Sequence, residues 1–233
     1  MINIMQIIAM ILLSVFFRDI LRLRVNPSFL EQFSDIQRLR VENGCIDSYS
    51  SMTKFLTVYM VLFLAFLNYY SRQEDYIIIR LKKRSSIAIN RSIIVLKVTL
   101  LIFIPHFVIN LLYNVHYYSW SLLKETRYFY SEFVYMVMII LFFCTLGTFY
   151  MMLFDYLKRF KKCGLIVAIS FVFYLLNRFY FQNGLARFLI YRDIILDGQE
   201  SIFEIMCWII IFISLCAFNI MSTSKKVERM DLL

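Results

Sequence analysis

The sequence predicts an all-α polytopic membrane protein, and three observations support this class. Of its 233 residues, 61% are hydrophobic and the mean hydropathy is +0.69, whereas soluble domains contain roughly 45–50% apolar residues. The apolar residues gather in stretches close to the length of about 20 residues that a helix needs to cross the hydrocarbon core. The polar residues form islands too short to enclose a core of their own. We therefore expect residues 1–233 to form a single transmembrane domain.

Six stretches are apolar enough to be transmembrane helices. The predicted spans are residues 2–17, 55–70, 93–112, 133–153, 164–180 and 202–221. The first span is short, so it either continues past Arg18 and Asp19 or lies in a thinned bilayer. No basic stretch precedes it and no A-x-A site follows it, which argues against a cleaved signal peptide. We expect it to be retained.

The placement of lysine and arginine predicts the orientation of the spans. With both termini cytoplasmic, the inner segments 71–92, 154–162 and 222–233 hold 13 basic residues in 43 positions, against 10 in 78 for the outer segments. The first outer loop, residues 18–54, carries six basic residues and argues the other way. Its length and the dense KRFKK run at 158–162 favour cytoplasmic termini.

Two amphipathic helices are predicted on the outer side. In the first outer loop, Ser28 and Glu31 fit a capping box, and Gly44 can end the helix. One face of this helix would carry Phe29, Phe33, Ile36 and Arg40 and lie along the membrane surface. A second segment, bounded by Gly184 and Gly198, is too short to cross the bilayer. Its apolar side comprises Leu185, Phe188, Leu189, Ile195 and Leu196.

A third amphipathic helix is predicted at 76–91, in the cytoplasmic connection between the second and third spans. It combines a helical stripe containing Ile78, Leu81 and Ala88 with a basic flank. Anionic lipid explains the charge. It does not explain the length, since two spans can be joined by roughly 2–8 residues. An intracellular helix that docks on another protein would need both features.

The sequence shows no chemistry for catalysis or for a resident cofactor. The five glycines lie too far apart for a phosphate-binding P-loop, and the predicted spans contain no deeply placed acidic residue. The only histidines are His106 and His116. Five cysteines without a C-x-x-C pair favour neither metal nor disulfide chemistry. They are Cys45, Cys144, Cys163, Cys207 and Cys216.

Polar residues within the spans have structural explanations. His106 follows Pro105, whose ring leaves a main-chain carbonyl free for the imidazole. Lys97 and Arg178 lie near enough to an interface for their charges to reach it, although charged residues inside a membrane are also functional candidates. His116 lies in an aromatic cluster that is typical of a membrane interface. Interhelical hydrogen bonds are expected from Asn110, Thr145, Thr148 and Asn177.

The architecture resembles the permease subunits of type-2 ABC exporters, particularly those of bacteriocin or lantibiotic transport and immunity systems in Gram-positive bacteria. Many of these permeases carry R-x-G-S-R-x-x-W in the coupling region. Here the matching run is RLKKRSSI, in which Arg80 and Arg84 fit, while Lys82, Lys83 and Ile87 replace the glycine, serine and tryptophan.

The resemblance implies a multi-pass permease in the bacterial cytoplasmic membrane. Two permeases, identical or homologous, would work with a dimer of a separate cytoplasmic ATPase that binds ATP and Mg²⁺. A peptide or amphipathic substrate would pass along the permease interface, where spans two and five meet. The coupling residues would be Ile78, Arg80, Leu81, Lys82, Lys83, Arg84, Ile87 and Arg91.

Two other functions stay open on the sequence alone. The chain could be a membrane anchor or an immunity protein that binds a peptide at the outer surface without an ATPase. It could also be a membrane enzyme that uses Arg178, Arg187 and Arg192 on an anionic lipid-linked substrate. The net charge of +9 does not indicate nucleic-acid binding, because loop topology and anionic lipid already account for it.

Overall fold

The structure is a computed structural model, and every regular element in its described part is helical. It describes residues 4–24, 34–43, 54–78, 85–153, 164–169, 171–172, 175, 191–196, 198 and 201–229. The elements are α1 (Ile4–Arg24), α3 (Asp35–Asn43), η1 (Phe55–Tyr59), α5 (Met60–Ile78), α6 (Ser85–Tyr117), α7 (Trp120–Glu125), α8 (Tyr128–Met152), α10 (Tyr191–Leu196) and α11 (Ile202–Arg229).

Three helices in the described part are long and apolar enough to cross a membrane: Ile87–Tyr117, Tyr128–Met152 and Ile202–Lys225. They contain the third and sixth predicted spans and all of the fourth except its last residue. Two shorter apolar helices, Ile4–Arg18 and Phe55–Ser71, coincide with the first and second. The structure is therefore helical as predicted, and its long apolar helices support a membrane protein.

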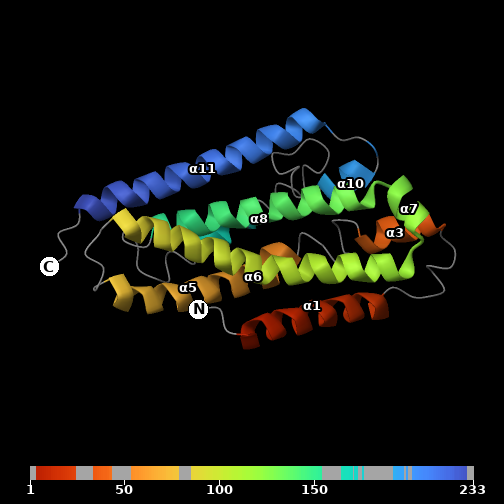
Figure 1. Cartoon of the computed structure of the whole chain (residues 1–233), viewed down its shortest axis with the longest axis horizontal. Coiled ribbons are helices and arrows are strands. Elements are labelled where there is room, and N and C mark those ends of the chain that lie inside the picture. Colours follow the sequence, from red (N-terminus) through yellow and green to blue (C-terminus); the bar gives the residue numbers. More distant parts are fainter. Residues whose placement is uncertain are drawn as a thin grey trace.

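The long helices lie side by side and form a bundle (Figure 1). α6 and α8 pack against each other, α11 packs against both, and α1 and α5 both pack on α6. The short helices α3, α7 and α10 gather at one end, which we call the capped end. The opposite end holds the ends of α5 and α11 and the start of α6.

Large aromatic side chains fill the core of the bundle. Phe55, Tyr59, Phe103, Tyr135 and Phe143 are all fully buried. The outward faces of α1 and α11 are apolar instead, with Leu12 and Phe203 among their exposed side chains. An apolar surface of this kind is stable against lipid and costly in water, so the surface agrees with a membrane environment.

α3 differs from the helix predicted in the first outer loop. The predicted capping pair lies outside the described residues, and the observed capping box joins Ser34 and Gln37 through two main-chain to side-chain hydrogen bonds of 3.1 and 3.4 Å. The helix buries Leu39 and Asn43. Arg40 of the predicted face is exposed and donates to the Leu196 carbonyl oxygen at 3.0 Å.

The end of the second amphipathic segment agrees with its prediction. α10 buries Ile195 and Leu196 against the bundle. Gly198 adopts φ +70°, and its N–H donates to the Ile195 carbonyl oxygen at 3.0 Å. This left-handed conformation is readily available to glycine, so the prediction of a helix end at Gly198 is confirmed. Residues 184–190 lie outside the described residues.

Candidate functional site

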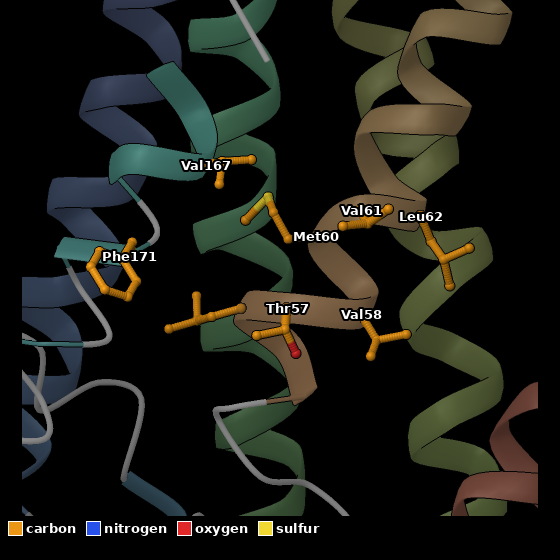
Figure 2. A pocket seen from close by; sticks show the side chains of 8 residues that line it. Thr57, Val58, Met60, Val61, Leu62, Val167 and Phe171 are labelled. Atoms are coloured by element: carbon orange, nitrogen blue, oxygen red, sulfur yellow. The ribbon is translucent and has the colours of Figure 1, made fainter. Parts of the chain in front are cut away.

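A groove of about 710 Å³ opens beside the start of the second predicted span (Figure 2). One side is formed by η1 and the first turn of α5, and the other by residues of the fifth predicted span. The lining residues are Leu56, Thr57, Val58, Met60, Val61, Leu62, Val167 and Phe171.

The lining determines which chemistry the groove can support. Thr57 supplies the only hydroxyl among the lining side chains, and none of them is charged. Ligand sites combine apolar surface with a few polar groups that orient the ligand. This groove therefore suits an acyl chain or the apolar face of an amphipathic molecule. Its lining lacks the acid and base that catalysis at this position would need.

The backbone beside the groove has an unusual hydrogen-bonding pattern. η1 is a turn of π-helix, in which the Met60 N–H reaches the carbonyl oxygen of Phe55, five residues back. π-turns are rare and occur frequently at functional sites. Thr57 and Val58 are exposed along the groove, whereas Phe55 and Tyr59 on the same turn are fully buried.

The buried side of η1 contacts α6 next to its proline. The Tyr59 hydroxyl and His106 Nδ1 are 2.8 Å apart, and the rings of Phe55 and His106 lie 5.0 Å apart between centroids. His106 is fully buried and directly follows Pro105, which lies inside α6. The sequence predicts a main-chain carbonyl partner for His106, and the structure places the hydroxyl of Tyr59 at its Nδ1.

A buried polar network lies at the capped end. Arg18 of α1 is 4% exposed and donates to Asn110 Oδ1 at 3.0 Å and to Glu42 Oε2 at 3.1 Å. Its guanidinium carbon also lies 3.7 Å from the centroid of the Tyr113 ring. A buried charge requires this degree of pairing. Arg18 thereby joins α1 to α3 and α6.

Amides and hydroxyls extend this network to α8. Asn110 Nδ2 lies 3.0 Å from Glu132 Oε1, and Asn114 Nδ2 donates to the Tyr128 hydroxyl at 2.9 Å. Both amides also donate to Asn43 Oδ1 of α3, at 3.1 and 2.9 Å. All five side chains are buried. Such networks impose one arrangement on their helices, because a lost partner leaves a polar group unsatisfied in a low-dielectric interior.

Tyr118 lies beside the network, just after α6 ends. Burial and the neighbouring Glu42 carboxylate raise the pKa of its hydroxyl above the ordinary value. The hydroxyl is therefore protonated at neutral pH and can donate to the carboxylate.

The sequence indicated only part of this network. Asn110 was expected to bond between helices, and its contacts with α8 confirm this. Glu132 lies one residue before the predicted fourth span, and α8 includes it as a 5% exposed side chain near its start. The four-residue spacing of Asn110 and Asn114, which places both on one helical face, was the available signal.

The remaining predicted interhelical contacts connect α8 to α11. Thr148 accepts a hydrogen bond from Asn219 at 3.1 Å, and Thr145 Oγ1 lies 3.4 Å from the Phe212 carbonyl oxygen. These contacts confirm the expectation for both threonines. Lys97 is exposed, as a side chain reaching towards an interface would be. Asn177 and Arg178 lie outside the described residues.

The predicted coupling segment is divided between two helices in its described parts. α5 ends at Ile78 and α6 begins at Ser85. Ile87 and Arg91 lie in the first turns of α6 and are only 3% and 9% exposed. The other predicted coupling residues, Arg80, Leu81, Lys82, Lys83 and Arg84, lie outside the described residues, as does the side chain of Ile78.

Cysteine and metal chemistry do not define a site in the described part of the chain. Cys144, Cys207 and Cys216 are free thiols, and no group of three potential metal ligands occurs among the described residues. Cys45 and Cys163 lie outside them.

No protein-family model matches the chain, and no curated protein or solved structure matches it either.

Proposed function

We propose that the chain is the membrane-spanning subunit of an ABC transporter in the bacterial cytoplasmic membrane. It moves a peptide or another amphipathic substrate and is powered by a separate ATPase dimer that binds ATP and Mg²⁺. The chain crosses the membrane six times with both termini in the cytoplasm. A second permease, identical or homologous, completes the transport unit.

The observation that carries this proposal is the apolar groove between the second and fifth predicted spans. An amphipathic substrate must keep its apolar face away from water, and the groove offers it a continuous apolar surface with Thr57 as a polar contact. The lining also argues against the alternative of a membrane enzyme acting at this position, since it contains no paired acid and base. A transport pathway needs only such a surface and a change in its accessibility.

The distribution of charge adds support. Residues 79–84 connect α5 to α6 and include Arg80, Lys82, Lys83 and Arg84. The described ends of these helices lie at the end of the bundle where α11 also finishes (Figure 1). Exposed Lys225 belongs to that last part of α11. Basic residues gathered at this end of the bundle favour a cytoplasmic location for it. An ATPase would be found on the same side of the membrane.

The burial of Ile87 and Arg91 refines the proposed contact with the ATPase. Side chains packed within their own chain are not free for a partner, so these two residues anchor the start of α6. The docking contact is then made by Ile78 and by residues 80–84. Movement of this short connection would be passed directly to α5, which lines the groove, and to α6.

Affinity purification of the chain from its native membrane tests the proposal. We expect an ABC-type ATPase to be recovered with it and the purified complex to hydrolyse ATP. Lys82→Glu combined with Lys83→Glu should reduce the recovered ATPase at least about tenfold, because reversed charge at a docking surface costs several kcal/mol. Lys225→Glu, a charge reversal at the same end of the bundle, is the matched control and should leave recovery unchanged.

Undiminished ATPase recovery in the double variant together with full transport would contradict the docking contact at residues 80–84. The proposed function itself is contradicted by a second result, a resistance or transport phenotype that persists when every candidate ATPase is deleted. The second result would favour a membrane anchor or an immunity protein that binds its peptide directly.

A further inference from the structure

η1 lies between the apolar groove and the aromatic core around His106. One side of this turn lines the apolar groove through Thr57 and Val58. The other side carries Phe55 and Tyr59 into the aromatic core, where both contact His106. A change in the hydrogen bonding of the buried side would therefore be transmitted to the groove through a single turn of backbone.

A π-turn contains one residue more than the regular helix would place there, so it has a natural second state. Relaxation to regular α-helix rotates the residues before the turn relative to those after it by about 100°, the angular step of one residue. Such a rotation would carry Leu56 and Thr57 away from Val61 and Leu62, which lie on the regular helix beyond η1. The groove would lose one continuous side.

The contacts on the buried side favour the π form. The Tyr59 hydroxyl is fully buried and lies 2.8 Å from His106 Nδ1. A rotation that separated the two groups would break this buried hydrogen bond, which is unfavourable. Phe55 adds ring contacts with Phe103 and Phe107 of α6, at 5.7 and 6.2 Å between centroids. The partner helix is adaptable here, because Pro105 cannot donate its main-chain hydrogen bond.

We propose that η1 is a two-state element that opens and closes the apolar groove, and that the Tyr59–His106 hydrogen bond holds it in the open, π-helical state. The ligand class is the apolar face of an amphipathic molecule, so this inference rests on the proposed function for the identity of the cargo. The two-state behaviour itself is a property of this chain alone. Tyr59 and His106 are positioning residues, since they act on the groove through the backbone of η1.

Cysteine labelling of the full-length chain in detergent tests the inference. A cysteine at Val58→Cys reports on the groove. A cysteine at Ala65→Cys, exposed on α5 and outside the groove lining, reports on the regular helix beyond η1. Labelling rates with a bulky apolar maleimide are compared with those of the chain lacking the added cysteine. Tyr59→Phe should change the rate at position 58 by about three- to fivefold, the equilibrium equivalent of one buried hydrogen bond. The rate at position 65 should stay the same.

Two comparisons separate this effect from general loosening of the core. His106→Asn keeps a polar atom close to the position of Nδ1 and should retain the native rate, whereas His106→Leu should behave like Tyr59→Phe. Tyr150→Phe is the matched control, because the Tyr150 hydroxyl is also buried and donates to Asn68 Oδ1 at 2.6 Å. It should leave position 58 unchanged.

The inference is overturned if the labelling rate at position 58 is the same in Tyr59→Phe, His106→Leu and the native chain. It is also overturned if Tyr150→Phe changes that rate equally. Should Tyr59→Phe fail to fold, the two substitutions at His106 decide the question. The labelling measurement requires no ATPase. A negative labelling result would therefore leave the transporter proposal unaffected. Failure to recover an ATPase would likewise leave the labelling result unaffected.

Discussion

Gly147 is a point of close contact between α5, α6 and α8. A Cβ atom added to it would lie 2.4 Å from Val95 Cγ1 and 2.9 Å from Phe63 Cζ. Helices in membranes often approach through small residues, because van der Waals contact replaces much of the hydrophobic driving force there. Gly147 is therefore needed because it has no side chain, which allows the three helices to approach closely. Its backbone flexibility is not needed here.

Gly147→Ala should destabilise the bundle by about 1–3 kcal/mol, the usual cost of overpacking a well-filled core. Equilibrium unfolding in detergent measures this change in the free energy of unfolding. Gly164→Ala is the matched control, since nothing lies within 4 Å of a Cβ at that position. Equal stability of the two variants would show that the three helices separate easily at Gly147.

At the scale of elements, α3 is held on the bundle by polar contacts as well as by Leu39. Its Asn43 accepts hydrogen bonds from Asn110 and Asn114, and its Glu42 pairs with Arg18. A helix of nine residues has little stability by itself. Its position at the capped end thus depends on these tertiary contacts.

Arg18→Met should release α3, because it leaves the Glu42 carboxylate and the Asn110 amide without their charged partner. The Glu42 side chain is 16% exposed, so breaking this partly buried ion pair should cost about 1–3 kcal/mol, less than a fully buried one. The release is measured as faster reaction of a cysteine at Leu39→Cys with a water-soluble maleimide. Lys97→Met, which removes an exposed lysine from α6, should leave the reaction slow. An unchanged rate in Arg18→Met would show that apolar packing alone holds α3.

At the scale of the whole molecule, the two ends of the bundle differ in construction. The capped end carries three short helices and the buried network, whereas the opposite end carries the basic connection from α5 to α6 and the end of α11 (Figure 1). The positive-inside tendency predicts that the basic end lies in the cytoplasm. The capped end would then face outwards.

Labelling of intact cells with a membrane-impermeant maleimide checks this orientation. A cysteine at Ser34→Cys, exposed at the start of α3, should react before the cells are permeabilised. Cysteines at Lys82→Cys and Lys225→Cys should react only afterwards, and the chain without added cysteines provides the background. Labelling of Lys82→Cys from outside would reverse the orientation and remove the proposed ATPase contact.

Hydropathy located most of the described long helices but not their ends. The third span was predicted at 93–112, yet α6 runs from Ser85 to Tyr117. Hydrophobicity reports where a helix lies in lipid, whereas the helix itself continues wherever its main-chain hydrogen bonds are made. For the same reason, the separate amphipathic helix predicted at 76–91 merges with α5 and α6 in its described residues.

The sequence by itself determined the class of the protein, because the length and apolar character of each stretch decide whether it is stable in lipid. It also determined local features such as the helix end at Gly198, which depends on the conformational preference of one residue. Tertiary structure alone decided the polar network and the groove. Arg18, Glu42, Asn110 and Glu132 are far apart in the chain, and no local pattern encodes which of them will meet. The two sides of the groove likewise come from spans separated by about a hundred residues, so only the packing of the helices brings them together.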